Sequence, residues 1–347
     1  MAIFQRPRYQ EEAEVPRSAR PLPHDRLLCG PVIGGQLAPS ETQAERVTQI
    51  PLAGGGDPYD VAFADEAVWV TSDAGLYRID LATSEAVNVL PEDYLFRVSS
   101  GHGALWITTG SDGRVLRIDP RSQTLTAPID VSAGPVTDLA MSEEGVWASA
   151  SSDLVRIDPV TNEVVTRLRN DRGFGAIAFG PSGLWVIAEA SREGEVWQID
   201  PATSDVRQRI PLANPSFWNE IAVGHGAVWV TSSPTVHEDG IALVHLYRID
   251  PSTGDITADI PLGDGASGLG PDEGAVSYSA LAVGESSVWT LVSFEGLLFR
   301  LDTGDLTMSD SEGGIACCSG VGPGMVVGAG SVWITAPGAI TRITLQT

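Results

Sequence analysis

The chain has 347 residues, of which 45 are acidic and 21 are Lys or Arg, so its formal net charge at pH 7 is −24. This acidity argues against partners such as nucleic acids or anionic membranes, because phosphate groups need a basic surface. It is compatible with a cationic ligand, a divalent metal ion or a solvated acidic surface.

The sequence gives no sign of membrane insertion or secretion. No apolar run approaches the roughly 18 residues that a membrane-spanning helix needs. The first 30 residues lack the apolar segment of a secretory signal peptide. We therefore expect no membrane span and, by default, a cytoplasmic location.

Residues 1–44 form a Pro- and Arg-rich segment that resembles nothing in the rest of the chain. Such a segment lacks the apolar residues for a core of its own. We expect a flexible arm or a segment that docks on a partner, followed by one domain over residues 45–347.

A motif centred on tryptophan recurs through that domain. In each copy a turn precedes an aliphatic residue, then Trp and usually a β-branched residue, as in GALWIT and GAVWVT. A second block follows each Trp and reads R-I-D or a close variant, such as YRID at 77–80 and LRID at 116–119. The motif Trp residues are Trp69, Trp106, Trp147, Trp185, Trp229, Trp289 and Trp333.

One complete repeat, residues 135–169, contains four short alternating segments separated by turn signals. Four strands in a repeat of about 40 residues are typical of a β-propeller blade. Seven copies predict an all-β fold, a seven-bladed β-propeller with four antiparallel strands per blade.

The two ends of the domain predict how the ring closes. The seventh repeat supplies three strands, the last over residues 339–345. Residues 46–52 match the outer strands of other repeats, at 206–212 and 256–262. We therefore expect the N-terminal strand to complete the last blade, which also covers an open sheet edge.

The repeat pattern W-V-T, R-I-D-P-x-T-G and I-P-L-G, seen most clearly around 229–262, resembles the virginiamycin B lyase-like, YVTN and NHL group of propellers. The resemblance covers roughly residues 45–347 and implies the fold more than a function, since the group includes lyases and binding modules. For the lyases it implies a divalent metal near the central funnel and a His as general base. The inner-strand entrances carry no His here, so that catalytic pattern is not reproduced residue by residue.

Several repeated polar residues have a structural interpretation. An Asp followed by Pro and a polar residue is typical of a type I turn. The two GHG sequences, around His102 and His225, are short turns before a motif Trp. We therefore assign these His residues and the Asp residues of the R-I-D blocks to turns, as for Asp119, Asp158 and Asp200.

Loop lengths predict which face of the disc carries function. The turns between the first and second strands, and between the third and fourth, hardly vary in length. All substantial insertions fall in the other loops, which share the opposite face, and they cluster in blades 4 to 6. Insertions confined to one face usually build a binding surface.

The two largest insertions, residues 232–240 and 263–274, offer a His and several carboxylates. Oxygen ligands of this kind suit Mg²⁺ or Ca²⁺, but the spacing matches no metal loop that we can name, and we favour solvated acidic loops over a metal site. The candidate metal ligands are His237, Glu238, Asp239, Asp272 and Glu273.

The entrances of the inner strands on this face line the central funnel, where we expect a ligand to bind. Trp218 lies outside the repeated Trp position, so it is either a ligand platform or packs on the 263–274 loop. The candidate ligand-binding residues are Tyr59, Asp60, Arg97, Asp138, Phe174, Trp218, Asn219, Glu220 and Tyr278.

Three cysteines leave alternatives open. Cys317 and Cys318 are adjacent and could form a vicinal disulfide, one of them could pair with Cys29, or all could be free thiols. A chain without a secretory signal favours free thiols.

The sequence favours a propeller that binds a small molecule or a protein through this loop-rich face. A second hypothesis is a metal-dependent lyase acting on a cyclic ester, with Glu220, Asp138 or His237 as the catalytic base. A third is a structural subunit of an assembly, tethered by residues 1–44.

Overall fold

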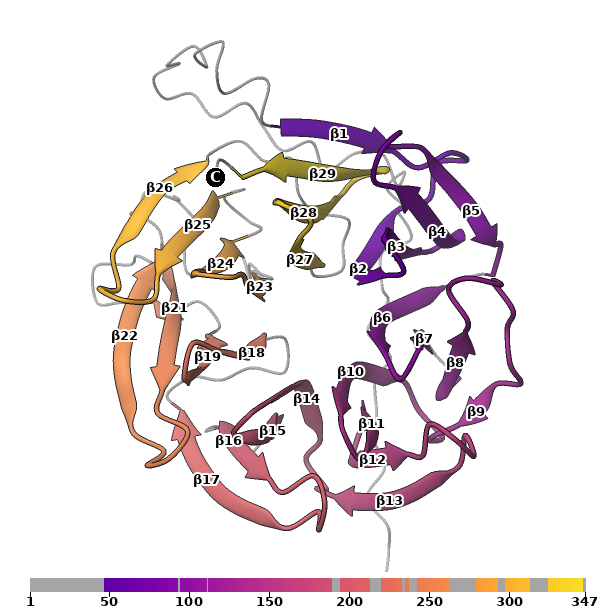
Figure 1. Ribbon diagram of the computed structural model, residues 1–347. Helices are drawn as coiled ribbons and strands as arrows, with labels where there is room; N and C mark the ends of the chain where they lie inside the picture. The colour runs from indigo at the N-terminus through magenta and orange to yellow at the C-terminus, as the bar shows by residue number, and fades with distance from the viewer. Residues whose placement is uncertain are drawn as a thin grey trace, which may run out of the picture. The chain divides into compact units, whose positions relative to one another are not determined.

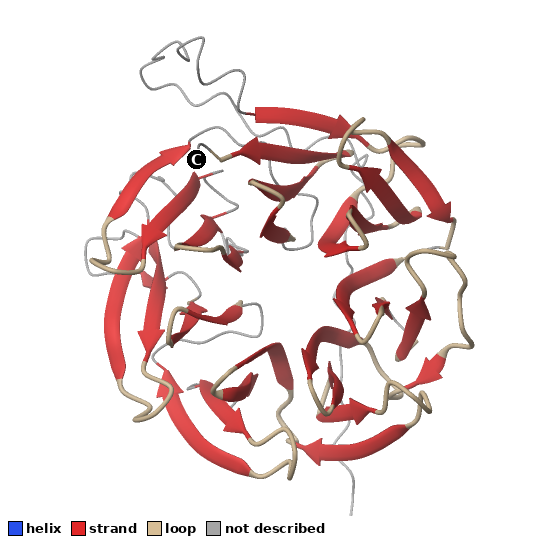
Figure 2. Cartoon of the chain, viewed as in Figure 1, coloured by secondary structure: helices blue, strands red, loops and turns tan. Residues whose placement is uncertain are grey.

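The computed structural model describes residues 47–92, 94–110, 112–188, 194–212, 220–232, 235–236, 242–262, 279–292, 297–312 and 324–345. They all belong to one compact unit, Glu41–Thr347. Seven antiparallel sheets are arranged in a ring (Figure 1). All the regular structure of the described residues is β, as Figure 2 shows. The predicted seven-bladed propeller is confirmed.

Each blade runs from an inner strand at the centre of the ring to an outer strand at the rim. Blade 1 comprises β2 (Pro58–Ala64), β3 (Ala67–Ser72), β4 (Gly75–Asp80) and β5 (Ala86–Leu90). Blade 2 comprises β6 (Leu95–Gly101), β7 (Ala104–Thr109), β8 (Arg114–Ile118) and β9 (Ile129–Asp130). Blade 3 comprises β10 (Val136–Ser142), β11 (Gly145–Ala150), β12 (Asp153–Ile157) and β13 (Val164–Arg169).

Blades 4 to 7 follow the same order. Blade 4 comprises β14 (Phe174–Gly180), β15 (Gly183–Ala188), β16 (Gly194–Ile199) and β17 (Val206–Leu212). Blade 5 comprises β18 (Ile221–Gly224), β19 (Ala227–Thr231), β21 (Ala242–Ile249) and β22 (Ile256–Leu262), with the short β20 (Thr235–Val236) added beside β21. Blade 6 comprises β23 (Ser279–Val283), β24 (Ser287–Val292), β25 (Leu297–Asp302) and β26 (Met308–Glu312). Blade 7 comprises β27 (Met325–Gly328), β28 (Ser331–Ala336), β29 (Ala339–Thr344) and β1 (Val47–Pro51).

The ring closes as the sequence predicts. β1 pairs with β29 in antiparallel register, Val47 opposite Ile343, and so supplies the outer strand of blade 7. Ile50 and Leu52 are buried in the apolar cluster that blade 7 shares with blade 1. Each inner strand contacts the inner strands of both neighbouring blades, and β27 contacts β2. The N-terminal strand therefore completes the last blade.

The motif Trp residues form the core between the blades, as their interpretation predicts. Six of the seven are fully buried, and Trp289 is 6% exposed. Opposite most of them on the next strand stands the Arg of the R-I-D block, as Arg117 stands opposite Trp106. The Arg117 guanidinium lies 5.1 Å from the centre of the Trp106 ring, a cation–π contact. The motif thus pairs a buried indole with a cation at the sheet surface.

The same Arg also ties one blade to the next. Arg117 Nη1 donates to the backbone carbonyl of Pro159 in blade 3 at 2.6 Å. Arg156 repeats this bond to Pro201 in blade 4 at 2.8 Å. The Arg and the Asp-Pro turn of adjacent repeats therefore act together to align neighbouring blades.

The repeated Asp residues have the predicted turn role. Asp158 Oδ1 accepts the backbone N–H groups of Val160 at 2.7 Å and Thr161 at 3.1 Å. These bonds hold the pKa of Asp158 below its ordinary value, because they stabilise the ionised carboxylate. Asp119, Asp200 and Asp250 make the same pair of contacts in their own turns.

No helix among the described residues is long and apolar enough to cross a membrane.

Candidate functional site

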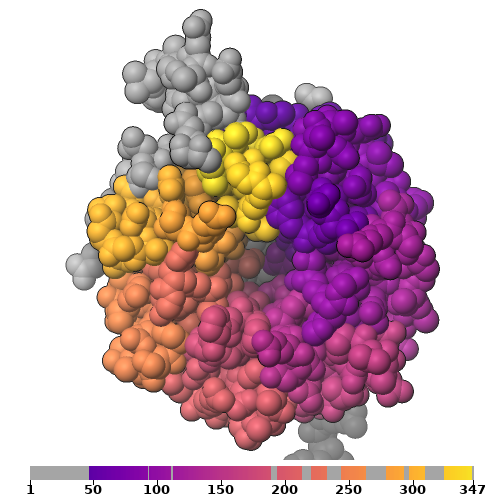
Figure 3. Space-filling model, viewed as in Figure 1, coloured from indigo at the N-terminus to yellow at the C-terminus, as the bar shows by residue number. Residues whose placement is uncertain are grey.

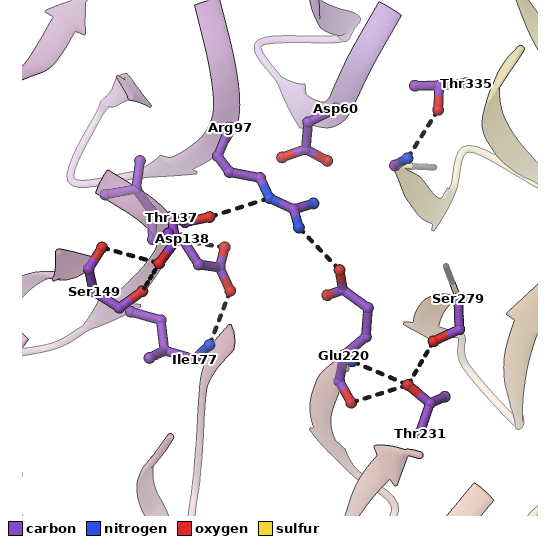
Figure 4. Close-up of polar contacts among 12 residues, drawn as sticks. Asp60, Arg97, Thr137, Asp138, Ser149, Ile177, Glu220, Thr231, Ser279 and Thr335 are labelled. Carbon is purple, nitrogen blue, oxygen red and sulfur yellow. Dashed lines mark hydrogen bonds and ion pairs between the residues drawn. The ribbon is translucent and has the colours of Figure 1, made fainter. Parts of the chain in front are cut away.

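One position in each blade, nine residues before the motif Trp, lies where the inner strand begins. Four of these residues carry charge, and their side chains converge at the centre of the ring (Figure 4). We call the set the inner ring: Asp60, Arg97, Asp138, Ala176, Glu220, Ala280 and Gly324.

Buried hydroxyl groups position the backbone of the inner ring. The hydroxyls belong to residues that stand two positions after a motif Trp. Thr108 Oγ1 accepts the backbone N–H of Arg97 at 2.9 Å. Thr231 Oγ1 accepts the backbone N–H of Glu220 at 3.0 Å and is hydrogen-bonded to Ser279 Oγ of blade 6 at 2.6 Å. These contacts fix the backbone that carries the charged side chains, because the hydroxyls themselves are fully buried.

Asp60 and Asp138 each join two blades. One oxygen of Asp60 accepts the N–H of Val61 at 2.8 Å, and the other accepts the N–H of Val98 in blade 2 at 3.0 Å. Asp138 accepts the N–H of the residue after it at 2.8 Å and that of Ile177 in blade 4 at 2.9 Å. Both carboxylates are therefore fixed in position, with lone pairs left for a further partner.

Gly324 allows the ring to close tightly against Asp60. A Cβ atom at this position would lie 2.6 Å from Asp60 Cα and 2.7 Å from its Oδ1. Atoms do not approach so closely, so only glycine fits between blades 7 and 1 at this level.

Arg97 crosses the centre of the ring. Its Nη2 donates to Glu220 Oε1 at 2.9 Å, which joins blade 2 to blade 5 on the far side. Its Nε donates to the backbone carbonyl of Thr137 in blade 3 at 3.3 Å. The guanidinium also lies 5.3 Å from the ring centre of Phe96. Only 17% of the Arg97 side chain and 18% of the Glu220 side chain are exposed.

Burial is the largest influence on the pKa values of the three carboxyl groups. It raises the pKa of Glu220 to about 7 and that of Asp60 to about 6, although Arg97 opposes both shifts. Burial also raises the pKa of Asp138. For Arg97, burial lowers the pKa, but the nearby carboxylates outweigh it and raise the pKa above its ordinary value. Arg97 therefore stays charged.

The chemistry of the inner ring follows from this charge set. Three carboxylates and one guanidinium carry a formal charge of −2 when all are ionised. Two of the carboxyl groups exchange protons close to neutral pH. The ring can therefore attract a cation, and it can accept or release a proton in the range where acid–base catalysis works best.

Two other predicted residues lie apart from this cluster. Tyr59 is half-buried and packs edge-on against Phe96, with ring centres 5.9 Å apart. Burial raises its pKa. Phe174 is fully buried and packs edge-on against Trp197 at 5.5 Å. Phe174 thus belongs to the core of blade 4 and offers no surface to a ligand in this arrangement.

The remaining predicted residues lie outside the described residues. They are the ligand candidates Trp218, Asn219 and Tyr278, the metal candidates His237, Glu238, Asp239, Asp272 and Glu273, and the cysteines Cys29, Cys317 and Cys318.

The described part of the chain contains no group of three or more His, Cys, Asp or Glu side chains placed to hold one metal ion. In the inner ring the guanidinium of Arg97 lies among the carboxylates and neutralises part of their charge, which disfavours a divalent metal ion ligated by all three. The metal site therefore stays a prediction.

Comparisons with known proteins extend these observations at the level of the fold. No family model matches the chain. No curated protein matches it either.

Solved structures do match. A hydrazine synthase structure from Kuenenia stuttgartiensis matches with a TM-score of 0.68 and 14% identity, over 89% of this chain and 99% of that chain. A chain of the mitotic checkpoint complex matches with a TM-score of 0.66 and 13% identity, over 93% and 98%. The Neurospora crassa Pan2 WD40 domain matches with a TM-score of 0.62 and 12% identity, over 87% and 96%.

At such low identity these similarities support the propeller fold and carry no residue-level information. The resemblance to the virginiamycin B lyase-like group stays a prediction.

Proposed function

We propose that this protein is a binding propeller whose inner ring takes a cationic group, either of a small molecule or of a protein side chain. The observation that carries the proposal is the convergence of three carboxylates from blades 1, 3 and 5 on a single guanidinium. The excess negative charge of this set favours a second cation. The loop-rich face on which the inner strands begin is the predicted route of entry.

The overall charge supports the same ligand class. A net charge of −24 attracts cations over a distance of about a Debye length, roughly 8 Å at physiological ionic strength. Asp60 and Asp138 are already oriented by backbone N–H groups, so little side-chain entropy is lost when they bind a ligand. Figure 3 shows a hollow at the centre of the disc.

Calorimetric titration with methylguanidinium, methylammonium, choline and, as an anionic control, acetate tests the proposal. We expect cation binding that weakens at least about tenfold in Asp60→Asn and Asp138→Asn and weakens with added salt. Asp130→Asn, an exposed carboxylate on β9, is the matched control. If no cation binds, or if the Asp130 variant loses as much affinity as the inner-ring variants, the proposal fails.

One observation favours an enzyme as the second candidate. The raised pKa of Glu220, about 7, suits a general base, and Arg97 at 2.9 Å suits the stabilisation of a developing anion. This arrangement would serve the elimination that the lyase-like resemblance implies. Glu220 would accept the proton and Arg97 would hold the carboxylate or enolate that forms.

A pH–rate profile on cyclic depsipeptide esters tests this candidate, with Glu220→Gln as the variant. An essential base predicts a rate that rises through pH 7 and is lost in Glu220→Gln. Thermal unfolding with EDTA, then with Mg²⁺ or Ca²⁺, tests the predicted metal, since an ion that binds the folded state raises the unfolding midpoint. The third hypothesis, an assembly subunit tethered by residues 1–44, concerns residues outside those described.

A further inference from the structure

On the opposite face, the turns after the inner strands meet at seams between neighbouring blades. The residue four before the motif Trp stands at each seam. His102 lies at the seam of blades 2 and 3, and its Nε2 donates to the backbone carbonyl of Ser142 at 2.8 Å. His225 lies at the seam of blades 5 and 6 and donates to the carbonyl of Gly284 at 2.9 Å. Two seams are thus bridged by an imidazole from the chain itself.

A third seam is bridged by an ion pair. In blade 1 the equivalent residue is Asp65, and Arg121 from the outer turn of blade 2 donates its Nε to Asp65 Oδ1 at 2.8 Å. The protein therefore provides internal examples of what fits this kind of seam. In all three cases the group that bridges the seam is a planar nitrogen donor, either an imidazole or a guanidinium.

At the seam of blades 6 and 7, no such bridge from the residue four before the motif Trp is present among the described residues. A groove of about 970 Å³ lies there, compared with about 530 Å³ at the Asp65 seam. The equivalent residue is Glu285, which is exposed and has no hydrogen-bond or ion-pair partner among the described residues. The groove walls include Val283, Trp289, Arg300, Val327, Gly330 and Leu345.

The walls of the groove suit an inserted side chain. Trp289 is the only one of the motif Trp residues with measurable exposure, 6%. Arg300 is held against it, 5.6 Å from the indole centre, and donates its Nε to Ser287 Oγ at 2.9 Å. Among the described residues, no atom would lie within 4 Å of a Cβ atom on Gly330, so none of them blocks the groove there.

We propose that this groove is a docking site for a protein loop that inserts a basic side chain, His or Arg, beside Glu285. The inserted group would repeat the role that His102, His225 and Arg121 have at their own seams. The equivalent backbone carbonyl is that of Gly328, which accepts the indole N–H of Trp333 at 3.2 Å. The charge of Glu285 and the acidity of the whole chain select a basic partner.

This site is independent of the inner ring. Gly324, at the inner ring, directly precedes the inner strand of blade 7, and Gly328 ends that strand at the groove. Four residues of extended chain separate the two by about 13 Å. Failure of one proposal therefore leaves the other unaffected.

Short peptides copied from the turn at residues 101–105 are suitable probes. The basic probes are acetyl-GHGAL-amide and acetyl-GRGAL-amide, and acetyl-GEGAL-amide is the acidic control. The readout is the indole N–H signal of Trp289 in NMR spectra of the full chain, assigned with Trp289→Phe. We expect a saturable shift of this signal with the basic peptides and at least about tenfold weaker binding of the acidic one.

Three variants make the test decisive. Glu285→Gln, which keeps the shape, should weaken binding about tenfold, and Glu285→His, which would fill the seam from within, should abolish it. Glu143→Gln, at the equivalent position of blade 3, should bind like the unchanged protein. No shift of the Trp289 signal at millimolar peptide overturns the proposal, and so does equal binding by Glu285→Gln or equal shifts of the other indole signals.

Discussion

Glu220 offers a quantitative test of the electrostatics of the inner ring. Its pKa is about 7 in the folded protein, compared with 4.5 for an ordinary glutamate. The folded state therefore holds this proton more tightly than the unfolded state. By linkage, the contribution of Glu220 to stability is highest below about pH 4.5 and falls as the pH rises to about 7. Above pH 7 it is constant.

The size of the effect follows from the shift. One pKa unit corresponds to about 1.4 kcal/mol, so the full effect is about 3 kcal/mol. This is an upper bound, because 18% of the Glu220 side chain is exposed to solvent. Unfolding entropy of about 2.1 cal/mol/K per residue over roughly 300 residues converts this to about 5 °C in the unfolding midpoint.

Glu220→Gln removes this titration while keeping an acceptor for Arg97. We expect the variant to gain about 3 kcal/mol relative to the unchanged protein as the pH is raised from 4 to 8. The assay is urea unfolding at several pH values, and the difference between the two proteins cancels the titration of groups that do not interact with Glu220. Glu144→Gln, an exposed turn residue, reports the general effect of removing one negative charge. A stability difference that does not change with pH would show that burial does not raise the pKa of Glu220.

Three further predictions concern the ring and the core, each measured by urea unfolding. Trp106→Phe should cost about 1 kcal/mol more than Trp147→Phe, because the Trp106 indole donates to Gly101 at 3.1 Å whereas the buried Trp147 Nε1 has no partner among the described residues. Equal costs would contradict this. Asp138→Ala should cost about 1–3 kcal/mol, because the N–H of Ile177 loses its acceptor, whereas Asp130→Ala should cost little. Comparable costs for the two variants would argue against a role of Asp138 in linking blades 3 and 4. Arg97→Gln should destabilise the fold more at pH 8 than at pH 5, because at pH 8 the ionised Asp60, Asp138 and Glu220 lack their counter-charge. The same loss of stability at both pH values would exclude Arg97 as the counter-charge.

The fold could be predicted from sequence because its signals are local and repeated. A Trp in an alternating strand, an R-I-D block and an Asp-Pro turn each specify one element, and seven copies specify the ring. The match of residues 46–52 to other outer strands was enough to predict closure of blade 7, which the pairing of Val47 with Ile343 confirms. The two-residue β9 was not foreseen. Pro128 directly precedes it and has no N–H to donate to a ladder.

The candidate site could be predicted only in part from the sequence. Asp60, Arg97, Asp138 and Glu220 could be placed at the inner-strand entrances, since each stands nine residues before a motif Trp. The contact between Arg97 and Glu220 could not be predicted from the sequence, because it depends on the diameter of the closed ring. The hydroxyl residues behind them were missed, although the Thr of W-V-T and W-I-T marks them in most repeats. Nothing local distinguishes Phe174, which faces the core, from a residue that faces the channel.

The most direct test of the central claim is the number of protons released when a cation binds the inner ring. A cation beside Asp60 and Glu220 favours their ionised forms, so binding near pH 6.5 should release protons. Titration of methylguanidinium into the protein in buffers of different ionisation enthalpy measures this number. We predict net release near pH 6.5, none at pH 8.5 and a reduced value in Glu220→Gln. Binding without proton release at pH 6.5 would contradict it.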